Sequence, residues 1–212
     1  MNKKPPFRKN IIKGGFFMNL ENSNTMINLM RAFAGESQAR NRYNMASETA
    51  RKDGYYAIAK IFDLTAYQEQ AHATVFYNFL QPVNFKNFDI SASYPVNIIT
   101  NTKDHLKYAV DNETDEYETI YKNFSEVAKN EGFDTISSAF ELIGKIENIH
   151  AMRFKELLND FDDDTIYQNK NEEIWICTNC GHIHHGPQAP FMCPVCSKER
   201  GYFLNNSYYT IL

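Results

Sequence analysis

Several features that mark common classes of protein are missing from this sequence. Basic residues are in no excess, because 22 Lys and Arg stand against 26 Asp and Glu and give a net charge of -4. A chain without a basic field is not expected to bind nucleic acid. No apolar run approaches the roughly 20 residues that a membrane-spanning helix needs. We therefore predict neither nucleic acid nor a membrane as a partner.

Cysteine is scarce and confined to one place. The chain of 212 residues has four cysteines: Cys177, Cys180, Cys193 and Cys196. They form two Cys-x-x-Cys pairs, a spacing typical of a metal site in a reducing compartment rather than of a disulfide scaffold. Four thiolates suit zinc and iron alike. We expect a cytoplasmic protein with a metal bound near its C-terminus.

The first seventeen residues show no periodicity, and their apolar residues are too scattered for a signal peptide. Lys13-Gly14-Gly15 can be encoded by a purine run containing AAGGAGG, a bacterial ribosome-binding sequence, with Met18 as the native start. We therefore predict that residues 1–17 are a non-native or disordered extension.

Hydrophobic residues are abundant, at 43% of the chain, which is ample for a packed core. They recur in steps of three and four over four long segments, and this period predicts helices. The expected helices run from the polar cluster 22–25 to Asp53, from Tyr55 to Leu80, from Lys103 to Glu131, and from Phe133 to about Leu158. Residues 81–102 contain two prolines and should form a long crossover, as in ferritin-like bundles. In the third helix the inward stripe is expected to include Tyr117 and Phe124.

Ionisable residues interrupt the apolar stripe of every helix. They are Glu36 on the first, Glu69 and His72 on the second, Glu113 and Glu116 on the third, and Glu147 and His150 on the fourth. A single Glu in such a stripe is usually a boundary residue that reaches solvent, but seven residues at matching depths are not accidental. Buried carboxylates need compensation, and a metal ion accepts carboxylate and neutral imidazole together. This pattern is typical of di-iron and di-manganese bundles.

The chain divides into two folded parts. We predict a mainly α protein with a four-helix bundle at residues 18–160, a polar linker at 161–173 and a small metal-binding unit at 174–212. About forty residues bury too little apolar surface to fold unaided, so the metal should contribute much of the folding energy of the small unit.

Three segments resemble the rubrerythrins. They are FAGESQARNRY at Phe33–Tyr43, Glu-Gly-Phe at 131–133, and WxCxxCG followed by CPxC at 175–196, which is similar to the family's rubredoxin-like domain. The resemblance extends from Met18 to Phe203. It implies a ferritin-like bundle, followed by a rubredoxin-like domain that binds one iron, or zinc, through its four cysteines.

The resemblance also implies roles for the bundle residues around two irons. Glu69 and Glu147 match bridging ligands, Glu36 and His72 the ligands of one iron, and Glu113 and His150 those of the other. Glu116 matches an additional carboxylate that alternates with the His72 imidazole when the redox state changes, and Tyr43 and Tyr121 match tyrosines that hydrogen-bond to the carboxylates. Two tail residues depart from the pattern, because Ser197 replaces a usual glycine and His182 a common aromatic residue.

The function implied is a peroxidase that reduces hydrogen peroxide to water in oxidative-stress defence. Electrons would pass from NAD(P)H, through a reductase or rubredoxin, to the cysteine-bound iron and then to the bundle, and family members form head-to-tail homodimers. Two alternatives stay open: a ferroxidase or other iron-handling protein, and a non-redox metal-binding module with a structural zinc site.

Overall fold

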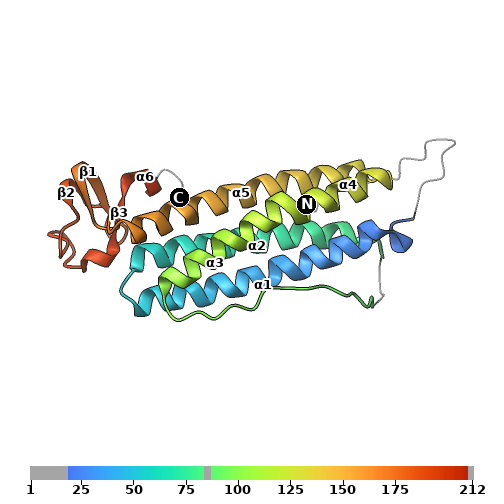
Figure 1. The fold of residues 1–212 in the computed structure, drawn as a ribbon, viewed down its shortest axis with the longest axis horizontal. Helices are drawn as coiled ribbons and strands as arrows, with labels where there is room; N and C mark the ends of the chain where they lie inside the picture. Colours follow the sequence, from blue (N-terminus) through green and yellow to red (C-terminus); the bar gives the residue numbers. More distant parts are fainter. Residues whose placement is uncertain (1–18, 84–86, 210–212) are drawn as a thin grey trace, which may run out of the picture.

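The computed structural model describes residues 19–83 and 87–209, so the prediction for residues 1–17 lies outside the described part. It shows an elongated helical bundle with a small sheet at one end (Figure 1). The bundle elements are η1 (Leu20–Asn22), α1 (Asn24–Lys52), α2 (Tyr56–Leu80), η2 (Gln81–Val83), α3 (Thr102–Asp115), η3 (Glu116–Ile120), α4 (Tyr121–Asn130) and α5 (Asp134–Asp162). The tail contains β1 (Gln168–Cys177), β2 (Ile183–Gln188), η4 (Arg200–Tyr202), β3 (Phe203–Asn205) and α6 (Asn206–Tyr209).

The predicted third helix is present as an unbroken helical run from Thr102 to Asn130, but its period is not constant. A π-helical segment, η3, separates α3 from α4. A π turn holds one more residue than an α turn, so it moves the inward face by one position along the sequence. Tyr117, expected inside, is 38% exposed, whereas Tyr121 is 2% exposed. A constant helical period cannot reveal such a shift.

The bundle consists of two helical hairpins: α1 with α2, and the run α3–η3–α4 with α5. The residues of the first hairpin can be aligned with those of the second. Each hairpin turn caps the first helix of the other hairpin. The Glu131 carboxylate accepts hydrogen bonds from the backbone N–H groups of Asn24 (3.0 Å) and Thr25 (2.8 Å), and Asp53 accepts one from the N–H of Thr102 (2.8 Å). These contacts satisfy donors that a helix start leaves unpaired. The bundle is therefore closed by two equivalent sets of contacts.

The correspondence places Glu36 with Glu113 and Tyr43 with Tyr121. Tyr43 follows Glu36 by seven residues, but Tyr121 follows Glu113 by eight. The second half thus contains one additional residue in this interval, where the π-helical segment lies. The extra residue lets both Glu113 and Tyr121 face the interior.

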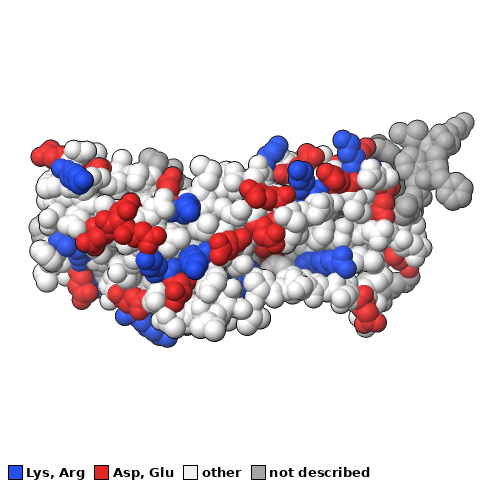
Figure 2. Space-filling view, viewed as in Figure 1, with Lys and Arg blue, Asp and Glu red and all other residues white. Residues whose placement is uncertain are grey.

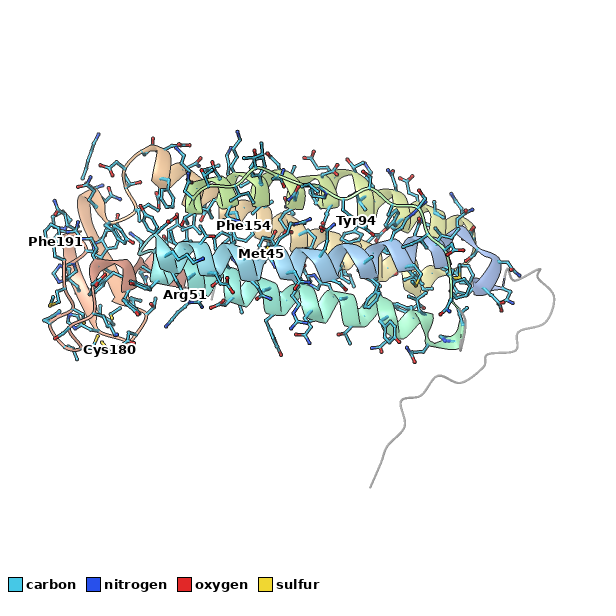
Figure 3. The ribbon with its side chains drawn as sticks, turned by 90° about the horizontal axis from the view of Figure 1, so that it is seen from below. Met45, Arg51, Tyr94, Phe154, Cys180 and Phe191 are labelled. Carbon is cyan, nitrogen blue, oxygen red and sulfur yellow. The ribbon has the colours of Figure 1, made fainter. Side chains whose placement is uncertain are left out.

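The crossover runs along α1, as Figures 1 and 3 show. The Tyr94 hydroxyl donates to the carbonyl of Arg31 (2.8 Å), and Nε of Arg31 donates to the carbonyl of Ser91 (2.9 Å). Residues 87–100 contain no helix or strand, and these contacts hold them on the bundle. The predicted long crossover is present in the fold.

The tail is an antiparallel sheet of strand order β2-β1-β3 around the buried Trp175. It rests on the end of the bundle, because Leu204 and Tyr208 share one apolar cluster with Ala57 and Ile58 of α2. The expected linker is largely replaced by regular structure, since α5 reaches Asp162 and β1 begins at Gln168. Two residues of the expected linker, Phe161 and Ile166, pack against the apolar cluster where the bundle and the tail meet.

Positive and negative side chains are intermixed over the face in Figure 2, without a basic field. In the described part of the chain, no helix has the length and apolarity needed to cross a membrane.

Candidate metal centres

The bundle interior brings together six of the seven expected ligands. None of them is more than 6% exposed. They form two overlapping groups whose ligand atoms lie within 4.8 Å of one another: Glu36, Glu69, His72 and Glu147 in one, and Glu69, Glu113, Glu147 and His150 in the other. Because Glu69 and Glu147 belong to both groups, they lie at the centre.

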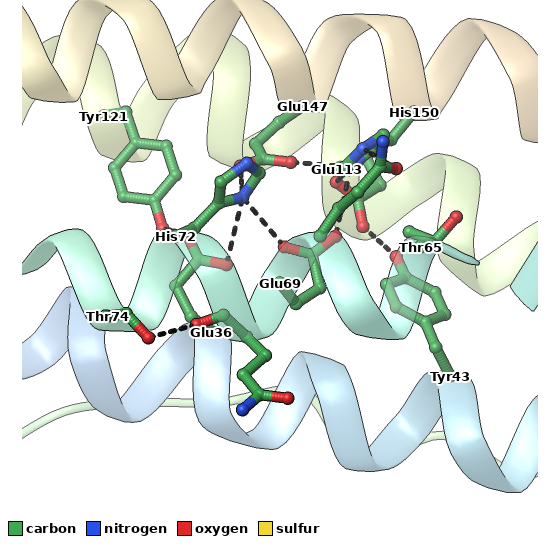
Figure 4. Close-up of polar contacts among 12 residues, drawn as sticks. Glu36, Tyr43, Thr65, Glu69, His72, Thr74, Glu113, Tyr121, Glu147 and His150 are labelled. Atoms are coloured by element: carbon green, nitrogen blue, oxygen red, sulfur yellow. Dashed lines mark hydrogen bonds and ion pairs between the residues drawn. The ribbon is translucent and has the colours of Figure 1, made fainter. Parts of the chain in front are cut away.

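Both imidazoles direct Nδ1 at the carboxylates (Figure 4). Nδ1 of His72 lies 2.9 Å from Glu147, 3.2 Å from Glu69 and 3.7 Å from Glu36. Nδ1 of His150 lies 2.8 Å from Glu147, 3.1 Å from Glu69 and 3.5 Å from Glu113. The two halves of the bundle thus provide nearly equivalent donor sets.

The free atoms of this cluster fit cations. Buried oxygens of Glu36, Glu69, Glu113 and Glu147, together with Nδ1 of His150, have no hydrogen-bond partner among the described residues. Burial raises the pKa of Glu113 to about 7, although His150 acts in the opposite direction. Burial and the carboxylates of Glu147 and Glu69 hold the pKa of Glu36 well above its usual range. Four carboxylates in one dry interior are stable as anions only with cations among them.

Each half of the bundle contributes a tyrosine to a carboxylate of the other half. The Tyr43 hydroxyl donates to Oε1 of Glu113, and the Tyr121 hydroxyl donates to Oε1 of Glu36. In both carboxylates Oε2 is the oxygen without a hydrogen-bond partner among the described residues. The phenols therefore orient the carboxylates with one oxygen available to a metal.

Glu116 is the expected ligand that the structure leaves outside both groups. It is the first residue of η3 and lines a pocket of about 740 Å³ between α1, the crossover and the run α3–η3–α4. Arg42, Tyr94 and Tyr121 line the same pocket. Glu116 thus lies between the cluster and a space open to solvent.

Two residues near His150 were missed by the sequence reasoning. Gln68 places Oε1 3.1 Å from Nε2 of His150, and Arg153 is 5% exposed. Arg153 follows His150 by one helical turn on the inward face of α5, so the criterion that found the ligands also applies to it. Nothing in the sequence indicated Gln68, because it directly precedes Glu69 and does not lie on the inward stripe of positions spaced by three and four residues.

The tail gathers the four cysteine sulfurs within 4.8 Å of one another. Cys177 lies 3.7 Å from Cys196, and Cys180 lies 3.7 Å from Cys193, between sulfur atoms. The two turns are alike, and each contains a residue in the left-handed region: Gly181 at φ 78° and Ser197 at φ 57°. The departure at Ser197 therefore places a side chain where glycine is favoured.

A four-helix bundle with a buried carboxylate and imidazole cluster, joined to a four-cysteine unit, defines a ferritin-like di-metal carboxylate protein with a rubredoxin-like tail. The family model "Rubrerythrin" matches residues 28–158, and "Rubrerythrin, rubredoxin-like domain" matches residues 175–204. The chain belongs to the rubrerythrin family. The bundle is accordingly a di-iron site with Glu and His ligands, and the tail is a site for one iron.

Comparison with individual relatives also places the chain in this family. The chain is 41% identical to rubrerythrin of Clostridium perfringens over 185 residues, covering 87% of this chain and 95% of that protein. It is 39% identical to rubrerythrin of Porphyromonas gingivalis over 184 residues, covering 87% and 90%. The solved mixed-valence state of nigerythrin matches with a TM-score of 0.58 at 25% identity, over 96% of this chain and 98% of that one. A Desulfovibrio desulfuricans bacterioferritin, at 20% identity, a TM-score of 0.61 and coverages of 70% and 86%, shares the bundle fold.

Proposed function

We propose that this protein is a peroxidase that reduces hydrogen peroxide to water in defence against oxidative stress. The observation that carries the proposal is the pair of ligand groups that share Glu69 and Glu147, in a chain that also gathers four cysteines. When bound, the two irons supply the two electrons that, with two protons, convert one H₂O₂ into two H₂O. Nigerythrin has been solved in mixed-valence and all-ferrous states, and this supports the proposal that the iron changes oxidation state in such a site.

In this proposal the residues of the bundle have three roles: they hold the metals, orient the ligands and form the route for the substrate. Glu69 and Glu147, which belong to both ligand groups, would serve both metals, Glu36 and His72 would hold one metal, and Glu113 and His150 would hold the other. Tyr43 and Tyr121 hold the terminal carboxylates in orientation. The pocket beside Glu116 is the route by which a small polar substrate reaches the cluster, since Glu116 and Tyr121 both line it. In our proposal Glu116 would be the alternative to His72 as a ligand when the redox state changes.

The tail passes electrons to the bundle from NAD(P)H, through a reductase or a rubredoxin. Phe191, Met192 and Val195 are exposed beside the cysteines and suit contact with a protein partner. Within one chain the tail stacks Tyr202 on Tyr56 at the start of α2, and Glu69 lies about 20 Å further along that helix at 1.5 Å per residue. A head-to-tail homodimer would bring the tail of one protomer to the cluster of its partner.

The experiment that tests the proposal compares two metal forms of the full chain. Protein with iron in both sites, reduced without oxygen, should be reoxidised in the bundle by one equivalent of peroxide and should turn over with NAD(P)H and a reductase. With zinc in the cysteine site, the single oxidation should persist and steady turnover should be lost. Undiminished turnover with zinc would contradict the relay, and failure of the single oxidation would contradict the peroxidase.

Zinc exchange is preferable to truncation after Asp164. Truncation would remove Leu204 and Tyr208 from the apolar cluster that they share with α2, and so would expose the end of the bundle. The zinc form leaves that contact in place. Oxidation of added Fe(II) by oxygen in preference to peroxide would instead support the ferroxidase alternative.

A further inference from the structure

The two imidazoles of the cluster occupy corresponding positions, yet their outer ring nitrogens have different surroundings. Nε2 of His150 lies 3.1 Å from Oε1 of Gln68. The ion-pair contacts of His72 are all made by Nδ1, and Nε2 of His72 has no hydrogen-bond partner within residues 19–83 and 87–209. His150 therefore has carboxylate contacts at Nδ1 and the Gln68 contact at Nε2, whereas within those residues His72 has polar contacts at Nδ1 alone.

A buried cation determines which way the Gln68 amide faces. Nη1 of Arg153 lies 3.4 Å from Oε1 of Gln68 and 3.4 Å from Oγ1 of Thr65. A guanidinium has donors and no acceptor, so the Gln68 atom that faces it is the oxygen. The same oxygen faces His150, so Nε2 of His150 carries the hydrogen. Its Nδ1 then keeps a lone pair directed at the metal site.

The other half of the bundle has no corresponding pair. The correspondence that matches Glu69 with Glu147 and His72 with His150 also matches Gln68 with Ile146 and Arg153 with Val75. Isoleucine and valine side chains neither accept nor donate hydrogen bonds. The asymmetry is thus present in the amino-acid sequence as well as in the contacts.

We infer that Gln68 and Arg153 are positioning residues that fix His150 as an Nδ1 ligand, while His72 lacks this support. A hydrogen bond at the outer nitrogen of a metal-bound imidazole fixes its tautomer and raises its basicity, and losing such a partner typically costs about 10–100-fold in metal affinity or activity. The two imidazoles therefore differ through residues outside the ligand set, because Gln68 contacts the outer nitrogen of His150 and, among the described residues, no equivalent is present beside His72. The inference rests on the two-metal site proposed above.

Zinc-loaded full-length protein labelled with ¹⁵N-histidine provides a test that does not depend on activity. With the cysteine site filled first, zinc is titrated into the bundle, and nitrogen shifts report the tautomer of each ring. We expect His150 to be metal-bound at Nδ1 and to show a slowly exchanging hydrogen at Nε2. The Nε2 hydrogen of His72 should exchange faster.

Variants separate positioning from folding. Gln68→Leu should weaken binding of one bundle zinc by about 10–100-fold and should speed hydrogen exchange at Nε2 of His150. Gln68→Glu keeps an acceptor and should restore slow exchange, whereas Arg153→Met should weaken zinc binding in the same direction as Gln68→Leu. Gln70→Leu, at an exposed position on the same helix, should leave both readouts unchanged.

Unchanged zinc affinity and unchanged exchange at His150 in Gln68→Leu would overturn the inference. If Gln68→Leu does not fold, Arg153→Met and Gln68→Glu decide the matter, and wild-type behaviour in Arg153→Met would overturn it. A wild-type bundle that binds fewer than two zinc ions would instead contradict the two-metal site itself.

Discussion

The phenol of Tyr121 in α4 donates a hydrogen bond to Glu36 in α1, from the opposite half of the bundle. Tyr43 makes the reciprocal bond to Glu113. Glu36 and Glu113 are therefore each oriented by a tyrosine from the opposite half of the bundle. Orientation of the site depends on correct packing of the two hairpins, and the following predictions separate the contributions of single residues.

Tyr121→Phe should weaken binding at the Glu36 and His72 side by about 10–100-fold, because Glu36 loses the donor that orients it. The outer oxygen of Glu36 is then buried without its partner, so the metal-free protein should also lose about 1–3 kcal/mol of stability. Metal titration and chemical unfolding measure the two effects. Tyr117→Phe, in the exposed part of η3, is the matched control, and equal effects in both variants would argue against orientation.

Glu147→Ala should leave fewer than two irons per bundle, since Glu147 is common to both ligand groups. The metal-free bundle should still fold, because the change removes one of several buried like charges. Metal analysis and thermal unfolding check both statements. Glu48→Ala, on the exposed face of α1, should retain both irons. Two irons in Glu147→Ala would rule out the bridging role.

Glu116→Gln should retain both irons, because Glu116 lies outside the two ligand groups. Its reoxidation by peroxide should be slower by about tenfold or more, as expected when a group that supports the metal ligands is lost. Rapid-mixing absorbance of the reduced protein measures the rate. Glu118→Gln, exposed in the same π-helical segment, is the control. A wild-type rate in fully loaded Glu116→Gln would refute its role.

Glu131→Gln should lower the stability at neutral pH by about 1 kcal/mol, the typical contribution of a helix cap. The pKa of Glu131 is lowered: burial acts in the opposite direction, but the hydrogen bonds from Thr25 and Asn24 outweigh it. A lowered folded-state pKa stabilises above the unfolded pKa, and the gain is lost as pH falls through the folded value. The difference between wild type and variant should therefore shrink in acid. Denaturant unfolding against pH tests this, with exposed Glu126→Gln as control.

Ser197→Gly should stabilise the tail by up to about 1 kcal/mol, because a non-glycine residue in the left-handed region costs about 1–2 kcal/mol and glycine loses part of that gain to chain entropy. Gly181→Ser, at the corresponding turn, should destabilise it. Both residues are exposed, so packing does not obscure the comparison. Zinc release from the four cysteines during unfolding gives the readout. Destabilisation by Ser197→Gly would show that its hydroxyl compensates for the strain.

The amino-acid sequence by itself determined the helices and most of the candidate ligands. A carboxylate or imidazole that recurs in an apolar stripe must be compensated, and that requirement is local to each helix and visible without a structure. Glu69, His72, Glu147 and His150 follow this rule, as do Glu36 and Glu113. The four cysteines were equally plain, because their spacing alone matches a metal site.

Only the tertiary structure decided the rest. The π-helical segment turns Tyr117 outward, although the helical period placed it inside, because no constant period predicts an inserted residue. Packing of α2 on α5 brings Gln68 to His150, a contact between residues far apart in the chain. Part of the segment expected as a linker is regular structure: α5 extends to Asp162, and β1 begins at Gln168, where it pairs with β2. Helical period describes one helix at a time, whereas these features arise from how helices meet.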